Sequence, residues 1–249
     1  MMDYLAMPKD GRWVAVNRSF AGDIDYCSIV SKIQRTARDV QVWFHDLDDN
    51  HAKSPAKDIA MRAVGTGHLS SDYISWCAGT AIALAKQGKS CETERWRLYV
   101  DKFLRGTDAR EQLKAMFTPE RVCRSLYLGV RGFCSLFPAA GHHYVSRNID
   151  EVVSAYASAL DFDISYPESD QKHKVVEKFI FDNPQIEKYA VDGDSAEDAM
   201  MIDVLRHYRK DVIGFYSMDA SRESDADEMF DVFTGKDRTG IVDILKESS

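Results

Sequence analysis

The 249-residue chain is poor in cysteine and has no cysteine pair spaced for a metal site or a redox motif. Its five cysteines (Cys27, Cys77, Cys91, Cys123 and Cys134) are scattered, with neither CxxC nor zinc-like spacing. An odd number of isolated thiols argues against a disulfide framework and favours a reducing compartment. We therefore expect a cytoplasmic protein whose thiols are mostly buried.

Long apolar runs and excess positive charge are also lacking. The first residues, MMDYLAMPKDGRW, show no basic-then-apolar leader pattern, and no apolar stretch approaches the roughly 20 residues that cross a bilayer. Lys and Arg number 32 against 40 Asp and Glu, a net charge of −8. An acidic surface disfavours nucleic acids and anionic membranes as partners. A phosphorylated small molecule stays compatible, because one bound cation reverses the field inside a pocket.

The first half of the chain predicts one strand followed by a helical block. A short strand within 12–20 and an amphipathic helix within 23–39 precede the apolar run VQVWF at 40–44, which is typical of a buried strand. Ser54 followed by Pro55 indicates a helix start, and the pattern from 56 to about 121 is helical with few strand-like runs. A block of this length suits a small subdomain.

Strand and helix alternate in the second half. This alternation predicts an α/β fold with a parallel, doubly wound sheet. The expected strands lie near 142–146, 162–165, 187–192, 211–217 and 229–233, and the expected helices lie within 148–162, 170–183, 196–210 and 239–248.

Polar side chains follow three of the predicted strands. Asp46 and Asp48 come after the strand at 40–44, Ser146 ends the strand near 142–146, and Asp194 follows the strand at 187–192. Ligands of doubly wound sheets bind at the carboxyl ends of the strands. Carboxylates at neighbouring strand ends, such as Asp46 and Asp194, suit a hard cation like Mg²⁺.

The same residues suit phosphoryl transfer. A carboxylate can attack phosphorus, and a second carboxylate two residues on can protonate the leaving oxygen and later activate water. A serine hydroxyl can bind a phosphoryl oxygen, and a lysine can neutralise the moving charge. The helix predicted within 170–183 offers Lys172, Lys174 and Lys178 for the last role.

Four motifs in this order resemble the haloacid dehalogenase superfamily of phosphohydrolases. They are DLDDN at 46–50, a strand ending in Ser146, a lysine opening a helix, and GDSAED at 193–198. In the family they read as DxDx(T/V), Ser or Thr, Lys and GDxxxD. The resemblance covers roughly residues 40–249, and phosphoserine-phosphatase-like members have a helical cap between the first two motifs. It implies a Rossmann-like core at 41–54 and 125–249 and a helical cap at 55–124. Residues 1–40 lie outside the resemblance, and we expect them to form an N-terminal extension packed on the core.

The resemblance also implies roles. Asp46 would be the nucleophile and Asp48 the general acid and base. Ser146 and Lys172 would bind phosphate, with Lys174 as the alternative lysine. Mg²⁺ would be held by Asp46, the Asp48 carbonyl and Asp194, with Asp198 in support. Arg147 either binds a substrate anion or forms a surface salt bridge. The implied activity is Mg²⁺-dependent hydrolysis of a small phosphorylated metabolite through an aspartyl-phosphate, because dehalogenases of the family do not need Asp48.

The sequence departs from the family motif at two places, and alternatives to a phosphatase stay open. Asn50 stands where the family usually has Thr or Val, and His51 and Lys53 predict a polar mouth to the site. A non-catalytic protein of this fold that binds a phosphorylated ligand or a partner, and a phosphotransferase or phosphomutase, remain alternatives. A homodimer is also left open.

His142 and His143 are adjacent on a strand and should face opposite ways, so we expect one buried histidine and no shared metal.

Overall fold

The computed structural model describes residues 4–9, 12–22, 25–48, 50–53, 117–148, 150–167, 169, 171–218 and 229–246. Most of the predicted cap lies outside these residues, as do Asp49, Cys77 and Cys91. Within the described ranges, no helix is long and apolar enough to cross a membrane.

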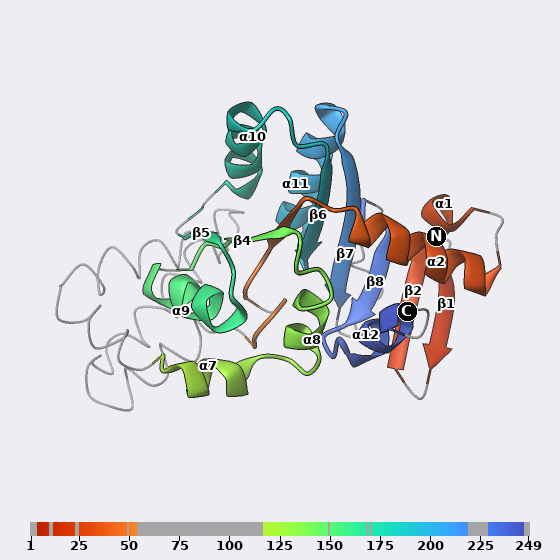
Figure 1. Ribbon diagram of the computed structural model, residues 1–249, viewed down its shortest axis with the longest axis horizontal. Coiled ribbons are helices and arrows are strands. Elements are labelled where there is room, and N and C mark those ends of the chain that lie inside the picture. The colour runs from red at the N-terminus through yellow and green to blue at the C-terminus, as the bar shows by residue number, and fades with distance from the viewer. Residues whose placement is uncertain are drawn as a thin grey trace, which may run out of the picture.

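The described strands form one eight-stranded sheet (Figure 1). They are β1 (Tyr4–Lys9), β2 (Arg12–Asn17), β3 (Val42–His45), β4 (Gly141–Val145), β5 (Ile164–Tyr166), β6 (Lys188–Gly193), β7 (Asp211–Met218) and β8 (Val232–Gly235). Their order across the sheet is β1-β2-β8-β7-β6-β3-β4-β5. Strands β3 to β8 pair in parallel, which confirms the predicted parallel core. The β1–β2 hairpin, red in Figure 1, adds to the β8 edge in antiparallel orientation.

Helices cover both faces of the sheet. They are α1 (Arg18–Ala21), α2 (Tyr26–Arg38), α7 (Pro119–Ser125), α8 (Val130–Cys134), α9 (Asp150–Leu160), α10 (Lys172–Asp182), α11 (Ala196–His207) and α12 (Thr239–Lys246). Residues of α2, α7, α8, α9 and α12 share one apolar core with Trp43, whereas residues of α10 and α11 share a second core with Phe44. Because neighbouring strand residues point to opposite faces, β3 supplies both cores. This is the doubly wound arrangement that the sequence predicts.

Strand β3 lies where the side on which successive strands are added to the sheet switches. It pairs with β4 on one side and β6 on the other. The chain adds β4 and β5 outward on the first side, then β6, β7 and β8 on the second. The carboxyl ends of β3 and β6 therefore form the switch point at which doubly wound sheets bind ligands. All four residues of β3 are buried, as expected for a strand covered on both faces.

The adjacent histidines of β4 do face opposite ways. His142 stacks on Trp43, and His143 stacks on Tyr166 on the other face. The prediction that one of the two histidines is buried was wrong, because both side chains are buried. The cause is the double covering of β4, which leaves neither face to solvent.

Candidate active site

Lys172 connects two of the predicted carboxylates. Its Nζ lies 2.6 Å from Oδ1 of Asp46, just beyond β3, and 2.7 Å from Oδ1 of Asp198 on α11. All three side chains are buried. Burial alone would lower the pKa of Lys172, but the carboxylates of Asp198 and Asp46 raise it above its ordinary value. The alternative Lys174 is exposed on the same helix. The structure thus brings Lys172, as a cation, to the carboxylate of Asp46.

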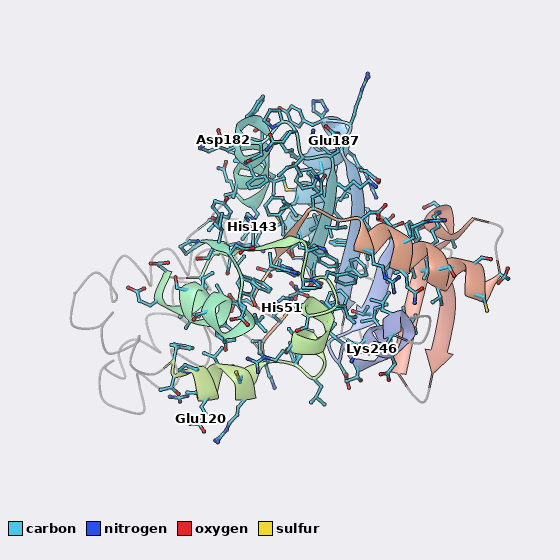
Figure 2. The ribbon with its side chains drawn as sticks, viewed as in Figure 1. His51, Glu120, His143, Asp182, Glu187 and Lys246 are labelled. Carbon is cyan, nitrogen blue, oxygen red and sulfur yellow. The ribbon has the colours of Figure 1, made fainter. Side chains whose placement is uncertain are left out.

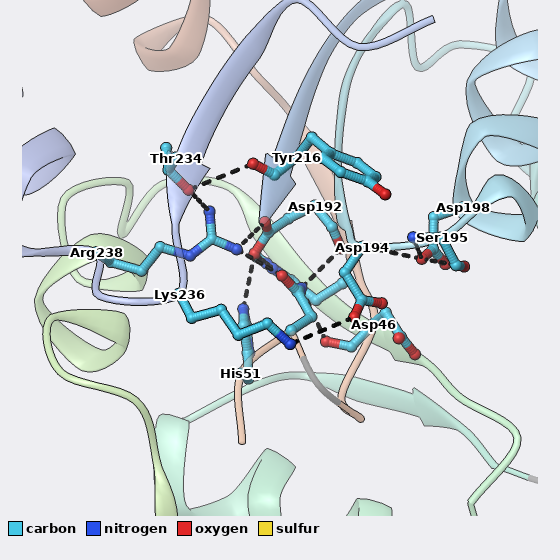
Figure 3. Close-up of polar contacts among 12 residues, drawn as sticks. Asp46, His51, Asp192, Asp194, Ser195, Asp198, Tyr216, Thr234, Lys236 and Arg238 are labelled. Carbon is cyan, nitrogen blue, oxygen red and sulfur yellow. Dashed lines mark hydrogen bonds and ion pairs between the residues drawn. The ribbon is translucent and has the colours of Figure 1, made fainter. Parts of the chain in front are cut away.

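The turn after β6 is organised by Asp198. Its Oδ2 accepts hydrogen bonds from the backbone N–H of Asp194 (3.0 Å) and from the N–H and hydroxyl of Ser195 (3.1 and 2.7 Å; Figure 3). Ser195 and Asp198 also form the capping box that opens α11. A Cβ atom on Gly193 would lie 2.3 Å from Cβ of Asp198. The glycine before Asp194 is therefore required for Asp198 to fold beneath the strand end.

The carboxylates at this edge of the sheet fit a hard cation. Asp46, Asp194 and Asp198 each place an oxygen within 4.8 Å of the others. Burial raises the pKa of Asp46 to about 7; the charge of Lys172 opposes this rise, and the neighbouring carboxylates add to it. Burial, followed by the charges of Asp46 and Asp198, also raises the pKa of Asp194. A divalent cation would relieve this repulsion, and carboxylate oxygens are the ligands that Mg²⁺ prefers. Both oxygens of Asp198 already have protein partners, so Asp46 and Asp194 have the better placed ligand atoms.

Ser146 and Asp48 lie on the β4 side of the site and are connected through Asn148. Ser146 is buried, and its Oγ accepts a hydrogen bond from the Asn148 N–H at 3.1 Å. The Asn148 side chain donates to both oxygens of Asp48, at 3.0 and 3.3 Å. Sequence reasoning missed Asn148, although its position two residues after Ser146 could have suggested it. Arg147 forms an ion pair with Glu197 of α11.

Beneath the site, Asp192 accepts hydrogen bonds from several buried side chains. Arg238 Nη2 donates to Asp192 Oδ1 at 2.6 Å, and His51 Nε2 donates to Oδ2 at 2.8 Å (Figure 3). His51 Nδ1 in turn accepts from the Tyr144 hydroxyl at 2.7 Å. Burial opposes ionisation of Asp192, yet Arg238 and the histidines hold its pKa well below the usual value. The prediction that His51 contributes to a polar mouth was wrong, because His51 lies in the interior (Figure 2).

A second group, His45, His51 and Cys134, also has its ligand atoms close enough to hold a metal ion. However, every ring nitrogen of the two histidines already has a partner. Nδ1 of His45 lies 3.3 Å from Oδ2 of Asp192, and Nε2 of His45 lies 3.0 Å from Nδ1 of His142. The two ring nitrogens of His51 contact Tyr144 and Asp192. We therefore interpret this group as part of the Asp192 network.

Asn50, the departure from the family pattern, is buried beside Asp46. Its Nδ2 donates to the backbone carbonyls of Asp46 (3.1 Å) and Asp192 (3.0 Å). Its Oδ1 accepts from Arg238 Nη2 at 2.5 Å. The Asn50 amide thus has a partner for each of its hydrogen-bonding groups, including both of its N–H bonds.

No protein-family model and no curated protein matches this sequence. Solved structures do match the fold. A cytosolic 5'-nucleotidase IIIB bound to cytidine has a TM-score of 0.58 at 10% identity, with 88% of each chain covered. A phospho-aspartyl intermediate analogue of phosphoserine phosphatase has a TM-score of 0.50 at 14% identity, covering 83% of this chain and 99% of that one. A putative haloacid dehalogenase-like hydrolase from Burkholderia xenovorans LB400 has a TM-score of 0.50 at 11% identity, covering 84% and 98%.

The chain has the haloacid dehalogenase fold. A fourth structure, DsGPDH of Dunaliella salina, has a TM-score of 0.55 at 12% identity. The match covers 74% of this chain but only 33% of DsGPDH, so this chain spans about a third of that protein. In the haloacid dehalogenase fold seen here, the four sequence motifs converge at the carboxyl ends of β3, β4 and β6 and at the start of α10.

Proposed function

We propose that this protein is a Mg²⁺-dependent phosphatase that hydrolyses a small phosphorylated metabolite through an aspartyl-phosphate on Asp46. The observation that carries the proposal is the position of Lys172 between Asp46 and Asp198, with Asp194 close to the same carboxylate. A buried lysine held against a carboxylate at the switch point of the sheet suits phosphoryl transfer to that carboxylate, because the ammonium can stabilise the charge on the moving phosphoryl group.

In the first step, a carboxylate oxygen of Asp46 bonds to phosphorus as the bond to the leaving oxygen breaks. Asp48 gives its proton to that oxygen, and the Lys172 ammonium neutralises charge on the phosphoryl group. Ser146, buried at the end of β4, donates its hydroxyl hydrogen to a phosphoryl oxygen. The phosphoryl group is then attached to Asp46, and the alcohol departs.

In the second step, Asp48 takes a proton from water as the water oxygen bonds to phosphorus. The bond to Asp46 breaks, phosphate leaves, and Asp48 is again protonated. The Asn148 amide donates to both oxygens of Asp48 and so fixes the orientation of its side chain. Mg²⁺, held by Asp46, the Asp48 carbonyl and Asp194, with Asp198 in support, would neutralise the phosphate charge in both steps.

The test is hydrolysis of p-nitrophenyl phosphate by the full chain with Mg²⁺, compared with metal-free protein and with Asp46→Asn. We expect release only with metal and with Asp46 intact, and acid-stable labelled phosphate on the wild type but not on Asp46→Asn. Equal release by Asp46→Asn would overturn the mechanism, and binding of phosphate without release would favour a non-catalytic binding protein.

Substrate and product analysis separates a phosphatase from a phosphotransferase. A panel can begin with a nucleoside 5'-monophosphate and phosphoserine, because two solved structures of this fold are named for a nucleotidase and a phosphoserine phosphatase. Free phosphate as the product supports hydrolysis, whereas transfer to a second hydroxyl would support a transferase or mutase. We place the activity in the cytoplasm, because isolated cysteines suit a reducing compartment.

A further inference from the structure

The backbone of the nucleophile is connected to β6 by a side chain. The last backbone hydrogen bond between the two strands runs from Asp46 N–H to the Asp192 carbonyl at 2.8 Å. The Asn50 amide donates to that same carbonyl and to the carbonyl of Asp46. Asn50 thus extends the connection between β3 and β6 past the point where their backbone pairing ends. Asp194, whose carboxylate is a proposed metal ligand together with that of Asp46, lies two residues beyond Asp192.

Arg238 fixes the orientation of that amide. This residue follows β8, is fully buried, and reaches Asn50, Asp192 and Thr234 with its guanidinium group. A cation facing Oδ1 of Asn50 leaves Nδ2 facing the two carbonyls, so the amide has one favourable orientation. Buried ion pairs such as Arg238–Asp192 contribute little net stability, because both charges lose water. Stability alone therefore does not account for a buried arginine here.

We propose that Asn50 and Arg238 act as a clamp that sets the distance between the carboxylates of Asp46 and Asp194. They are positioning residues for metal binding and nucleophilic attack, and this role rests on the proposed function. The amide of Asn50 can donate to both strands at once, whereas the Thr or Val usual in the family offers one donor or none. An amide that offers two N–H donors also has an oxygen, Oδ1, that needs a hydrogen-bond donor, and Arg238 is that donor.

The decisive variants are Asn50→Leu and Asn50→Thr, with Gln34→Met as the matched control. Gln34 is a buried amide that likewise donates to two carbonyls, those of Ile244 and Leu245, at 3.2 and 3.1 Å. It joins α2 to α12, and it makes the same kind of contact as Asn50 without touching the proposed site. Any effect of simply losing a buried amide should therefore appear in both Asn50→Leu and Gln34→Met.

Two readouts separate positioning from stability. For folded Asn50→Leu, we expect kcat on p-nitrophenyl phosphate to fall about 100-fold while KM changes about threefold or less. We expect the affinity for Mn²⁺ alone, measured by calorimetry, to fall about tenfold. Asn50→Thr keeps one donor and should give intermediate values for both, and Gln34→Met should match the wild type in both.

Arg238→Lys tests the other half of the clamp. Lysine keeps a positive charge beside Asp192 but lacks the planar fork, so we expect kcat and Mn²⁺ affinity to fall as in Asn50→Thr. Unchanged kcat and Mn²⁺ affinity in Asn50→Thr and Arg238→Lys would overturn the clamp, as would equal losses in Gln34→Met. If the wild type hydrolyses no phosphate ester, the proposed function fails, and the Mn²⁺ affinities of the same variants still decide the clamp.

Discussion

The ammonium group of Lys172 lies 2.6 Å from the Oδ1 atom of Asp46. Replacing Lys172 with Met should lower kcat about 100- to 1000-fold, because the charge that stabilises the moving phosphoryl group is lost. Lys174→Ala, which removes an exposed lysine two residues along α10, should keep wild-type kcat. Steady-state kinetics on the two purified variants checks this. A large loss in Lys174→Ala and none in Lys172→Met would reverse the assignment of the motif lysine.

Asp48→Asn should separate the two chemical steps. p-Nitrophenolate is a good leaving group and needs no acid, so Asp46 can still be phosphorylated. Water is then activated poorly, and the turnover rate should fall about 100- to 10,000-fold. We expect a burst of p-nitrophenolate close to one per protein chain, followed by a slow phase, in rapid-mixing measurements. A slow phase without a burst would show that Asp48 is not needed specifically for the second step.

Gly193→Ala should damage the site through Asp198. The added Cβ would lie 2.3 Å from Cβ of Asp198, which holds Lys172 and the Asp194 turn. We expect a loss of about 1–3 kcal/mol in the free energy of unfolding, together with reduced kcat. Gly132→Ala is the control, because the nearest atom to its added Cβ is a Val242 methyl at 3.7 Å. Urea unfolding should show Gly132→Ala to be as stable as the wild type or more so. Equal stability of Gly193→Ala and wild type would contradict the close packing.

His143 should make the fold sensitive to acid. Burial lowers its pKa from 6.5 to about 4, so the unfolded chain takes up this proton at a higher pH than the folded chain does. The contribution of His143 to stability is therefore complete above about pH 6.5 and is lost as the pH falls toward 4. After allowance for partial solvent screening, the loss is about 2 kcal/mol. Comparing urea unfolding of wild type and His143→Phe at pH 7 and pH 4.5 tests this, and a stability difference independent of pH would refute it.

Much of the fold followed from local sequence, because the alternation of strands and helices in the second half predicted the parallel sheet. Asp46, Ser146 and Asp194 were proposed as site residues because each follows an apolar strand, and their roles stay predictions. The hairpin strand β1 was missed because it contains Pro8, which a central strand would not accept. Within the described sheet β1 lies at an edge, where a missing N–H is tolerated.

The buried polar network could not be read in the same way. Asp192 looks like one more residue of a buried strand, and Arg238 like a charge in a loop. Their relationship depends on pairing between segments far apart in the chain, with Asn50 and Arg238 separated by 188 positions. His51 was placed at the mouth of the site because it follows the first motif at a position where the family commonly has an apolar residue. The carboxylate of Asp192, which draws it inward, carries no local sequence signal.

That same separation bears on how the protein is made. A nascent chain emerges from its N-terminus, so Asp46, Lys172 and Asp194 are all synthesised before Arg238. Until then the charge of Asp192 has no guanidinium partner, and the Asn50 oxygen faces no cation. Strand β8, which joins the N-terminal hairpin to the parallel core, is synthesised only just before Arg238. Closure of the sheet and assembly of the proposed site are thus expected to be one late event. A ribosome-stalled chain ending before residue 238 would contain Asp46, Lys172 and Asp194, and we expect it to hydrolyse phosphate esters poorly.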